Sequence, residues 1–227
     1  MKATLRSRIL LGFAALIAAT ASAQAALIQG NTAASAENTG SNFSGTLLYA
    51  ANAAGTAAIL TVDLLNTTPA GVGGFLTGFL MNNPDETKIT GISAYTTATN
   101  FTQIGLSANG ANGAPFGDFD FGAALNANWQ GGGTPSAGLA PGSSGSFAFL
   151  FSGTSLNTLT EQSFESALSG GPGIGQGPQY FVARFRGLID GGSDKVPAGA
   201  VPEPSTTAML LAGLAVVIGI GVRRTRS

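Results

Sequence analysis

The stretch Ile59-Leu60-Thr61-Val62-Asp63-Leu64 alternates apolar and polar side chains, and this alternation decides the fold class. Successive side chains of a strand point to opposite faces, so the three apolar residues at even-numbered positions share one face. Thr61 and Asp63 share the other face, which is the pattern of a half-buried strand. The turn-forming run Asn66-Thr67-Thr68-Pro69-Ala70-Gly71 then ends the strand.

The same period of two is readable in further segments on both sides of this strand. They are residues 45–50, 75–81, 88–95, 101–106, 146–151 and 180–188. One segment departs from the pattern: Thr158-Leu159-Thr160-Glu161 has capping-box spacing, and Gly170-Gly171-Pro172 ends the helix that it predicts. We therefore expect a mainly β chain, a β-sandwich of jelly-roll type with about seven to nine strands, and one short helix near residues 159–169.

The distribution of charge sets the middle of the chain apart from its ends. Charged residues make up 9% of the 227 residues, against about 25% in a typical soluble domain. All eleven acidic residues lie between Glu37 and Glu203, and only four of the ten basic residues lie there with them. We expect no nucleic-acid partner, because this acidic segment has little with which to neutralise phosphates.

Cysteine and histidine are both absent from the sequence. Their absence excludes a cysteine nucleophile, a Ser-His-Asp triad, a cysteine or histidine zinc site and a histidine-bound haem. We accordingly expect no catalytic residues, no cofactor and no metal site.

The N-terminal residues 1–25 are typical of a secretory signal peptide. Three basic residues precede an apolar run at 9–19, and the small-residue stretch Ala21-Ser22-Ala23-Gln24-Ala25 follows it. Small residues at positions −3 and −1 fit cleavage after Ala25, which we prefer, or after Ala23. An uncleaved anchor is the alternative, but the apolar run is too short for ~30 Å of hydrocarbon. The expected partners are the secretion machinery and signal peptidase.

The C-terminus has the reverse order of features. Residues 206–222 carry no charge and would span about 25 Å as a helix at 1.5 Å per residue. Arg223, Arg224 and Arg226 follow them, and the positive-inside rule places these arginines in the cytoplasm and the preceding body outside it. Immediately before the helix stands Val201-Pro202-Glu203-Pro204, which the two prolines hold extended. The residues alone predict a rigid spacer before a membrane helix. In the simplest alternative to a processed signal, this helix is a permanent anchor.

This combination of Val201, Pro202, Glu203 and Pro204 with an apolar helix and an arginine cluster resembles the PEP-CTERM sorting signal of Gram-negative bacteria. The resemblance implies an exosortase, a membrane-embedded cysteine peptidase, that cuts near the motif. It also implies an association with exopolysaccharide and biofilm formation. Four segments between the two ends resemble sequences of uncharacterised PEP-CTERM body domains; they are residues 116–122, 129–133, 181–187 and 190–197. This resemblance implies an exported β-domain and supplies no activity.

Three carboxylate pairs are candidates for chemical sites. Asp118 and Asp120 lie two apart and resemble calcium ligands, but we interpret them as a polar edge or turn. Asp190 and Asp194 resemble half of a calcium loop, and we interpret them as part of a solvated linker.

The third pair, Glu161 and Glu165, has the i, i+4 spacing of neighbours on one helix face. Glycoside hydrolysis needs carboxyl groups on opposite sides of a sugar, so we interpret this pair as a polar helix face. The aromatic residues Trp129, Tyr49, Tyr95 and Tyr180 are candidates for stacking on sugar rings, and core packing is the alternative.

The expected organisation has five parts: a signal peptide (1–25), an exported β-sandwich domain (26–196), a linker with the motif (197–205), a transmembrane helix (206–222) and a basic cytoplasmic tail (223–227). The expected function is that of an exported cell-surface or extracellular-matrix protein, non-enzymatic, processed by an exosortase and associated with exopolysaccharide. A carbohydrate-binding module is the first alternative, and a polysaccharide hydrolase that uses carboxylates is the second.

Overall fold

The computed structural model describes residues 25–131 and 133–200. In this part the chain forms β1 (Ala26–Gly30), β2 (Phe43–Ala51), β3 (Ala57–Asn66), β4 (Gly73–Met81), β5 (Ile89–Thr97), β6 (Phe101–Ile104), β7 (Ala111–Asn112), β8 (Asp118–Phe119), β9 (Phe121–Leu125), β10 (Ser144–Gly153), β11 (Phe181–Leu188) and β12 (Ser193–Ala200). The helical elements are α1 (Glu161–Ser166) and the 3-10 turns η1 (Thr32–Ala34), η2 (Pro135–Ala137) and η3 (Leu156–Thr158).

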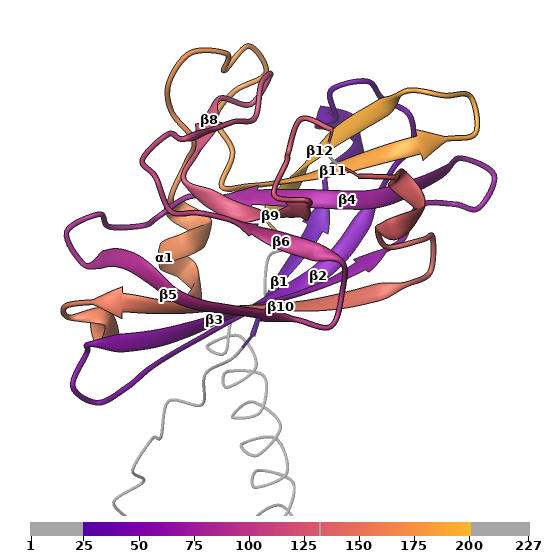
Figure 1. The fold of residues 1–227 in the computed structure, drawn as a ribbon. Coiled ribbons are helices and arrows are strands. Elements are labelled where there is room, and N and C mark those ends of the chain that lie inside the picture. Colours follow the sequence, from indigo (N-terminus) through magenta and orange to yellow (C-terminus); the bar gives the residue numbers. More distant parts are fainter. Residues whose placement is uncertain (1–24, 132, 201–227) are drawn as a thin grey trace, which may run out of the picture.

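Ten of these strands form one continuous antiparallel sheet in the order β5-β10-β3-β2-β1-β12-β11-β4-β9-β6. The pairing of β1 with β12 joins the two halves of the sheet. The sheet bends so that the halves face one another, and its free edges, β5 and β6, follow each other in the chain (Figure 1). The result is a nearly closed sheet.

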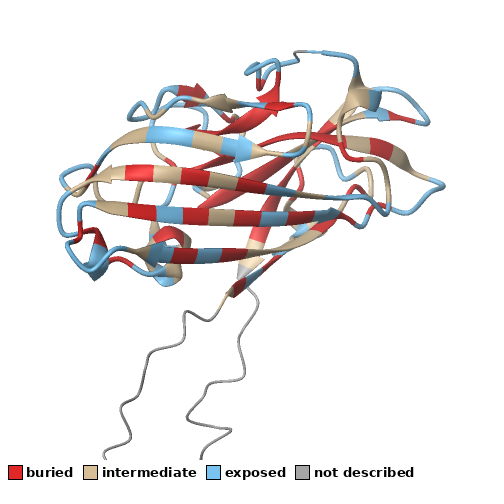
Figure 2. Ribbon diagram, turned by 60° about the horizontal axis from the view of Figure 1, so that its bottom comes forward, coloured by how far each residue is buried: buried red, intermediate tan, exposed pale blue. Residues whose placement is uncertain are grey.

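Phenylalanine rings from both halves fill the space between them. Phe79 of β4 contacts Phe147 of β10 at a ring-centroid distance of 4.9 Å, and Phe121 of β9 contacts Phe149 at 5.3 Å. Along β3 and β10, buried residues alternate with exposed or intermediate ones, as Figure 2 shows for the outer strands. This core of aromatic side chains fixes the two halves face to face, since each ring buries a large apolar area.

The expectation of a mainly β chain with one short helix is confirmed. All seven predicted strand segments lie on observed strands: β2, β3, β4, β5, β6, β10 and β11. The halves are stacked as in a sandwich, but the β1–β12 pair makes them one sheet, which the jelly-roll prediction did not anticipate. Twelve strands occur within the described ranges, more than expected, because β1, β7, β8, β9 and β12 went unpredicted.

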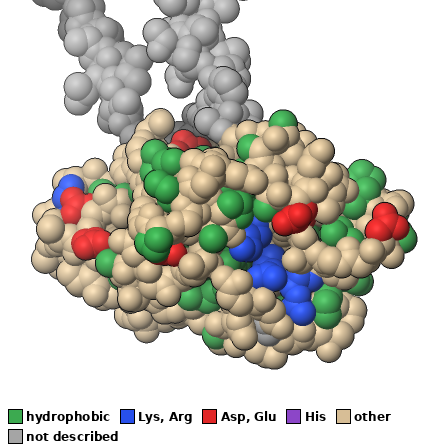
Figure 3. All heavy atoms as spheres, turned by 90° about the horizontal axis from the view of Figure 1, so that it is seen from above, with side chains coloured by type: hydrophobic (Ala, Val, Ile, Leu, Met, Phe, Trp, Pro, Cys, Tyr) green, Lys and Arg blue, Asp and Glu red, His purple; other side chains and the backbone are tan. Residues whose placement is uncertain are grey.

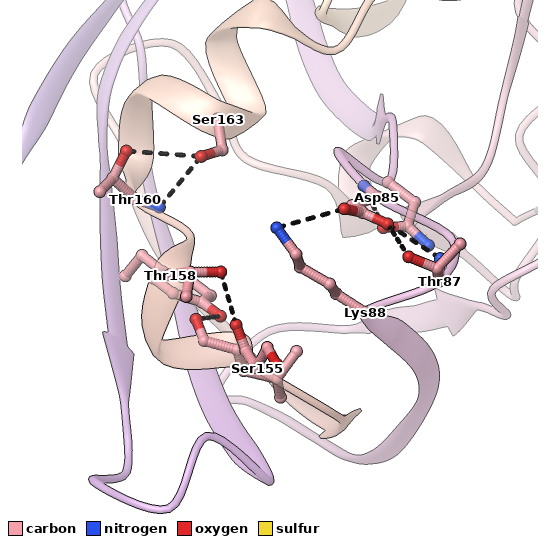
Figure 4. A network of polar contacts seen from close by, with 10 residues as sticks. Asp85, Thr87, Lys88, Ser155, Thr158, Thr160 and Ser163 are labelled. Carbon is pink, nitrogen blue, oxygen red and sulfur yellow. Dashed lines mark hydrogen bonds and ion pairs between the residues drawn. The ribbon is translucent and has the colours of Figure 1, made fainter.

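The helix is shorter than predicted and begins later. Its N-cap is Thr160, whose N–H donates to Ser163 Oγ at 3.1 Å, so the capping pair is Thr160–Ser163 rather than the predicted Thr158–Glu161 (Figure 4). The hydroxyl of Thr158 instead donates to the carbonyl of Ser155 at 2.7 Å, within the preceding turn η3. Phe164 is fully buried and packs on Tyr49 and Phe151, which attaches the helix to both β2 and β10.

Strand β12 continues to Ala200, so residues 197–200 of the predicted linker are paired in the sheet. Pro197 lies opposite Val182 of β11, and Ala198 lies opposite Gly30 of β1. Residues 1–24 of the predicted signal peptide, the apolar segment 206–222 and the basic tail lie outside the described residues. Within residues 25–131 and 133–200, none of the helices has the length and apolar character needed to cross a bilayer.

Candidate functional site

The two ends of the described body lie side by side. Ile28 of β1 is opposite Ala200 of β12, in the middle of the sheet. Ala25, the preferred signal-cleavage position, immediately precedes β1, whereas Ala23 lies outside the described residues. Cleavage after Ala25 stays a prediction, and it would leave β1 whole. The sorting residues Val201, Pro202, Glu203 and Pro204 and the arginines Arg223, Arg224 and Arg226 also lie outside the described part.

Asp118 and Asp120 are both buried, with 8% and 7% of their surface exposed. The carboxylate of Asp120 accepts one hydrogen bond from the N–H of Asn83 and another from the N–H of Asn109, each at 2.7 Å. Both oxygens therefore join loops of the fold. Asp118 Oδ1 is buried without a hydrogen-bond partner. In residues 25–131 and 133–200, no group of three or more acidic, cysteine or histidine side chains is arranged to hold a metal ion.

The interpretation of Asp194 as part of a solvated linker is wrong. Asp194 is 1% exposed, and its carboxylate accepts hydrogen bonds from the N–H groups of Glu37, Thr39 and Lys195 and from the Thr39 hydroxyl. These bonds tie β12 to the loop after η1. Asp190, by contrast, is exposed in the turn between β11 and β12. The glycine pair beside these aspartates resembled a flexible linker, but it forms the turn of a hairpin.

Glu161 belongs to the fold rather than to a free polar helix face. Its carboxylate accepts the N–H of Tyr49 at 2.8 Å, which links α1 to β2. Burial, together with the negative charge of Glu161, raises the pKa of Tyr49 to about 12.

The four aromatic residues weighed for sugar stacking do not form a platform, because their rings are covered. Trp129, Tyr49 and Tyr180 are each 5% exposed. Tyr95 is half-buried and packs on Phe149 at a ring-centroid distance of 5.1 Å. Stacking on sugar requires an accessible ring face, which these four residues do not offer together.

A cluster of three cations, which the sequence analysis missed, lies on the hairpin of β11 and β12. Arg184 is directly opposite Lys195, and Arg186 is two residues further along β11. Figure 3 shows basic side chains gathered on one face of the molecule. The available signal was compositional, since these three residues are all the cations between Lys88 and Arg223. We call Arg184, Arg186 and Lys195 the basic cluster.

Backbone carbonyls hold the side chains of the basic cluster. Arg184 donates from Nη1 to the carbonyl of Trp129 at 2.8 Å, and its guanidinium lies 6.0 Å from the centre of the indole ring. Lys195 donates to the carbonyl of Ala114, and Arg186 donates to that of Gly133. Arg184 Nε is buried without a partner.

The electrostatic environment of the basic cluster is unfavourable for positive charge. Burial lowers the pKa of Arg184, and the charge of Arg186 lowers it further. Burial and the charge of Arg184 likewise lower the pKa of Lys195, although Glu37 acts in the opposite direction. Neither Arg184 nor Lys195 has a carboxylate within ion-pair distance in the described part of the chain. The ion pair of Lys88 with Asp85, at 3.3 Å, is formed by a different part of the fold (Figure 4).

Comparison with known families identifies the segment that follows β12. Residues 200–226 match the family model of the PEP-CTERM protein-sorting motif. The chain carries a PEP-CTERM sorting signal. Neither the curated proteins nor the solved structures contain a match to the chain.

The PEP-CTERM signal means that the protein is exported, is anchored at the membrane before processing, and is sorted by an exosortase. The matched segment begins at Ala200, which is also the last residue of β12. Only residues 201–205 separate the folded body from the apolar segment. A fully extended chain spans at most about 3.3–3.6 Å per residue. The PEP-CTERM body is therefore held within about 20 Å of the start of that segment until it is processed.

Proposed function

We propose that this PEP-CTERM protein is a non-enzymatic component of the cell surface or extracellular matrix that associates with exopolysaccharide. The single observation that carries the proposal is the sorting signal at residues 200–226, which starts where β12 ends. A body joined so directly to its signal is the cargo that the sorting system delivers.

The hydrogen bonds of three carboxylates support a structural role. Asp120 and Asp194 use their oxygens to hold backbone N–H groups, and Glu161 links α1 to β2. A general acid or base needs a carboxyl group that can exchange a proton with substrate, and these groups are occupied within the fold. The hydrolase alternative consequently has little support from the geometry.

The carbohydrate-binding alternative keeps one supporting observation. Its aromatic platform is lost, but the basic cluster offers a surface on which anionic groups would be favourable. Binding by charge rather than by ring stacking is compatible with a matrix component. This alternative is therefore an addition to the proposed function and does not replace it.

Fractionation of the host cell tests the proposal. We expect the processed protein in the extracellular matrix of a polysaccharide-producing host, and its loss from that fraction in a strain that makes no exopolysaccharide. Purified protein incubated with the same polysaccharide should release no new reducing ends. A body that stays in the inner membrane, or that distributes identically in both strains, would contradict the matrix role, and sugar release would contradict the non-enzymatic one.

A further inference from the structure

We propose that the basic cluster of Arg184, Arg186 and Lys195 is a binding site for an anionic polysaccharide that carries carboxylates along its chain. This inference rests on the proposed association with exopolysaccharide and assigns it a ligand class and a surface. It follows from the distribution of charge, the desolvation of two cations and the shape of the surface beside them.

The first step is the concentration of positive charge. The described residues contain four cations and ten acidic residues, and three of those cations form the basic cluster. Anionic ligands are therefore attracted mainly to this cluster, whose basic side chains Figure 3 shows gathered on one face. Such an asymmetry selects where and in which orientation an anionic polymer would bind.

The second step is the destabilisation that repulsion and desolvation of the cations cause at this face. Like charges directly opposite each other on neighbouring strands destabilise a sheet, and Arg184 and Lys195 stand in that relation. Both are about half-buried, and burial lowers the pKa of each. An oxyanion of a ligand would offset this repulsion and desolvation, because charge-assisted hydrogen bonds are stronger than neutral ones.

The third step is a hollow of about 130 Å³ beside the cluster. It is lined by Arg184, Ser193 and Lys195 from the hairpin and by Ala114 and Pro115 from the loop before β8. Ala36, Glu37 and Asp194 complete the lining. The carboxylate of Asp194 accepts four hydrogen bonds from the fold. Glu37 is therefore the acidic group of the lining whose charge would repel an anionic ligand.

The fourth step is the linear arrangement of the cations. Arg184 and Arg186 lie on one face of β11, separated by about 6.6 Å at 3.3 Å per residue, and Lys195 lies across from Arg184. A row of charges fits a polymer with repeated anionic groups better than a single small anion. Carboxylates that a polyuronate repeats along its chain match such a row of charges, and binding to anionic lipid is the outcome that the vesicle measurement below distinguishes.

Titration of the detergent-solubilised full chain with polygalacturonate tests the inference. Wild type should bind this polyuronate, with an affinity that falls as salt rises, and should not bind neutral dextran. The double variant R184Q/K195Q should lose at least tenfold in affinity, whereas R184K/K195R should retain binding. Lys88→Gln is the matched control, because Lys88 is the one cation of the described residues that lies outside the basic cluster, and this variant should bind like wild type.

Melting curves of every variant accompany the titration. If R184Q/K195Q does not fold, the single variants Lys195→Gln and Arg186→Gln take its place, with at least a threefold loss expected for each. Equal binding of dextran, undiminished binding by the cluster variants, or an equal loss in K88Q would overturn the inference. Binding to phosphatidylglycerol vesicles in place of the polyuronate would overturn it as well.

The result is separable from the test of the proposed function. Matrix association that survives the cluster substitutions would leave the proposed function standing and reject this site. Polyuronate binding that depends on the cluster, in a protein that never reaches the matrix, would support the site and reject the proposed function.

Discussion

A single buried carboxylate, Asp194, shows how much of this fold depends on polar contacts that a linear sequence does not reveal. Asp194 lies in β12, and its hydrogen bonds reach Glu37 and Thr39, which are 157 and 155 residues away. Asp190, four residues earlier, is exposed. Two aspartates in one glycine-rich stretch therefore differ in burial and in their hydrogen bonds to the rest of the fold.

Replacing Asp194 with alanine should lower the free energy of unfolding by about 3 kcal/mol, because buried N–H groups would lose a charged acceptor. The same change at Asp190 should alter it by no more than about 0.5 kcal/mol. Urea denaturation of both variants measures the difference. Equal effects of the two substitutions would mean that the hydrogen bonds of Asp194 do not support the body.

Stability in strongly alkaline solution should fall because of buried tyrosines. Burial raises the pKa of Tyr49 from 10.0 to about 12 and also raises the pKa of Tyr95 and Tyr180. A folded-state pKa above the unfolded value gives stability that is complete below pH 10 and is lost as pH rises toward 12. Lys195, whose pKa is lowered from 10.5, acts in the opposite sense below that value, so the decline should appear above pH 10.5.

Thermal melting between pH 9 and pH 12, with tyrosinate absorbance as a second signal, checks this expectation. Tyr49→Phe should flatten the decline, although it also removes the hydrogen bond from the Tyr49 hydroxyl to Leu156. A melting temperature that stays constant up to pH 12 would contradict the assigned burial of the tyrosine hydroxyls.

At the scale of single elements, α1 depends on one side chain. The helix has six residues, too few for independent stability, and the fully buried Phe164 attaches it to Tyr49 and Phe151. Phe164→Ala should destabilise the protein by about 3–5 kcal/mol, as large aromatic truncations in cores do. Leu168, 56% exposed just beyond the helix, gives a control in which alanine should cost no more than about 0.5 kcal/mol.

Comparison of the two variants by denaturant unfolding isolates the packing contribution. A loss below about 1 kcal/mol for Phe164→Ala would show that the helix is peripheral to the core. The outcome also bears on Glu161, since its bond to Tyr49 can only form while α1 is in place.

The missed strand β9 differs from the predicted strands β3 and β10 in its burial pattern. β3 and β10 each have one face on the core, so their side chains alternate. All five residues of β9 are buried, which removes the alternation, and Gly122 is required there because a Cβ would lie 2.1 Å from the carbonyl oxygen of Phe79. β12 was hidden by Pro197 and by the glycines before it, which are typical of linkers.

The sorting signal and the basic cluster also differ in how far each can be predicted from the sequence. The sorting signal was readable because Pro202, Glu203, Pro204 and the basic tail are local in sequence. The basic cluster was not readable, because the pairing of Arg184 with Lys195 depends on the register of two strands. Local motifs survive without the fold, whereas cross-strand sites exist only within it.

At the scale of the whole molecule, the N-terminal boundary follows from the sheet. β1 begins at Ala26 and pairs with both β2 and β12, so it joins the two halves. We expect the exported protein to begin at Ala26, with Gln24 as the second choice, because both cuts follow small residues and leave β1 intact. N-terminal sequencing of the exported form measures this, and a sequence that begins at Met1 would contradict export with cleavage.

The central claim is that Val201-Pro202-Glu203-Pro204 is read by a sorting peptidase, so the most direct measurement compares wild type with a variant in which Pro202, Glu203 and Pro204 are alanine. The apolar segment 206–222 and the arginines are unchanged in this variant, so the energetics of membrane insertion stay the same and only recognition is altered. Intact-mass spectrometry of fractionated cells should show wild type without its C-terminal segment and the variant at full length in the inner membrane. Deletion of the host exosortase should reproduce the variant's behaviour. Identical fractionation of the two proteins, with Arg226 retained in both, would contradict the account and leave a body tethered by a plain anchor.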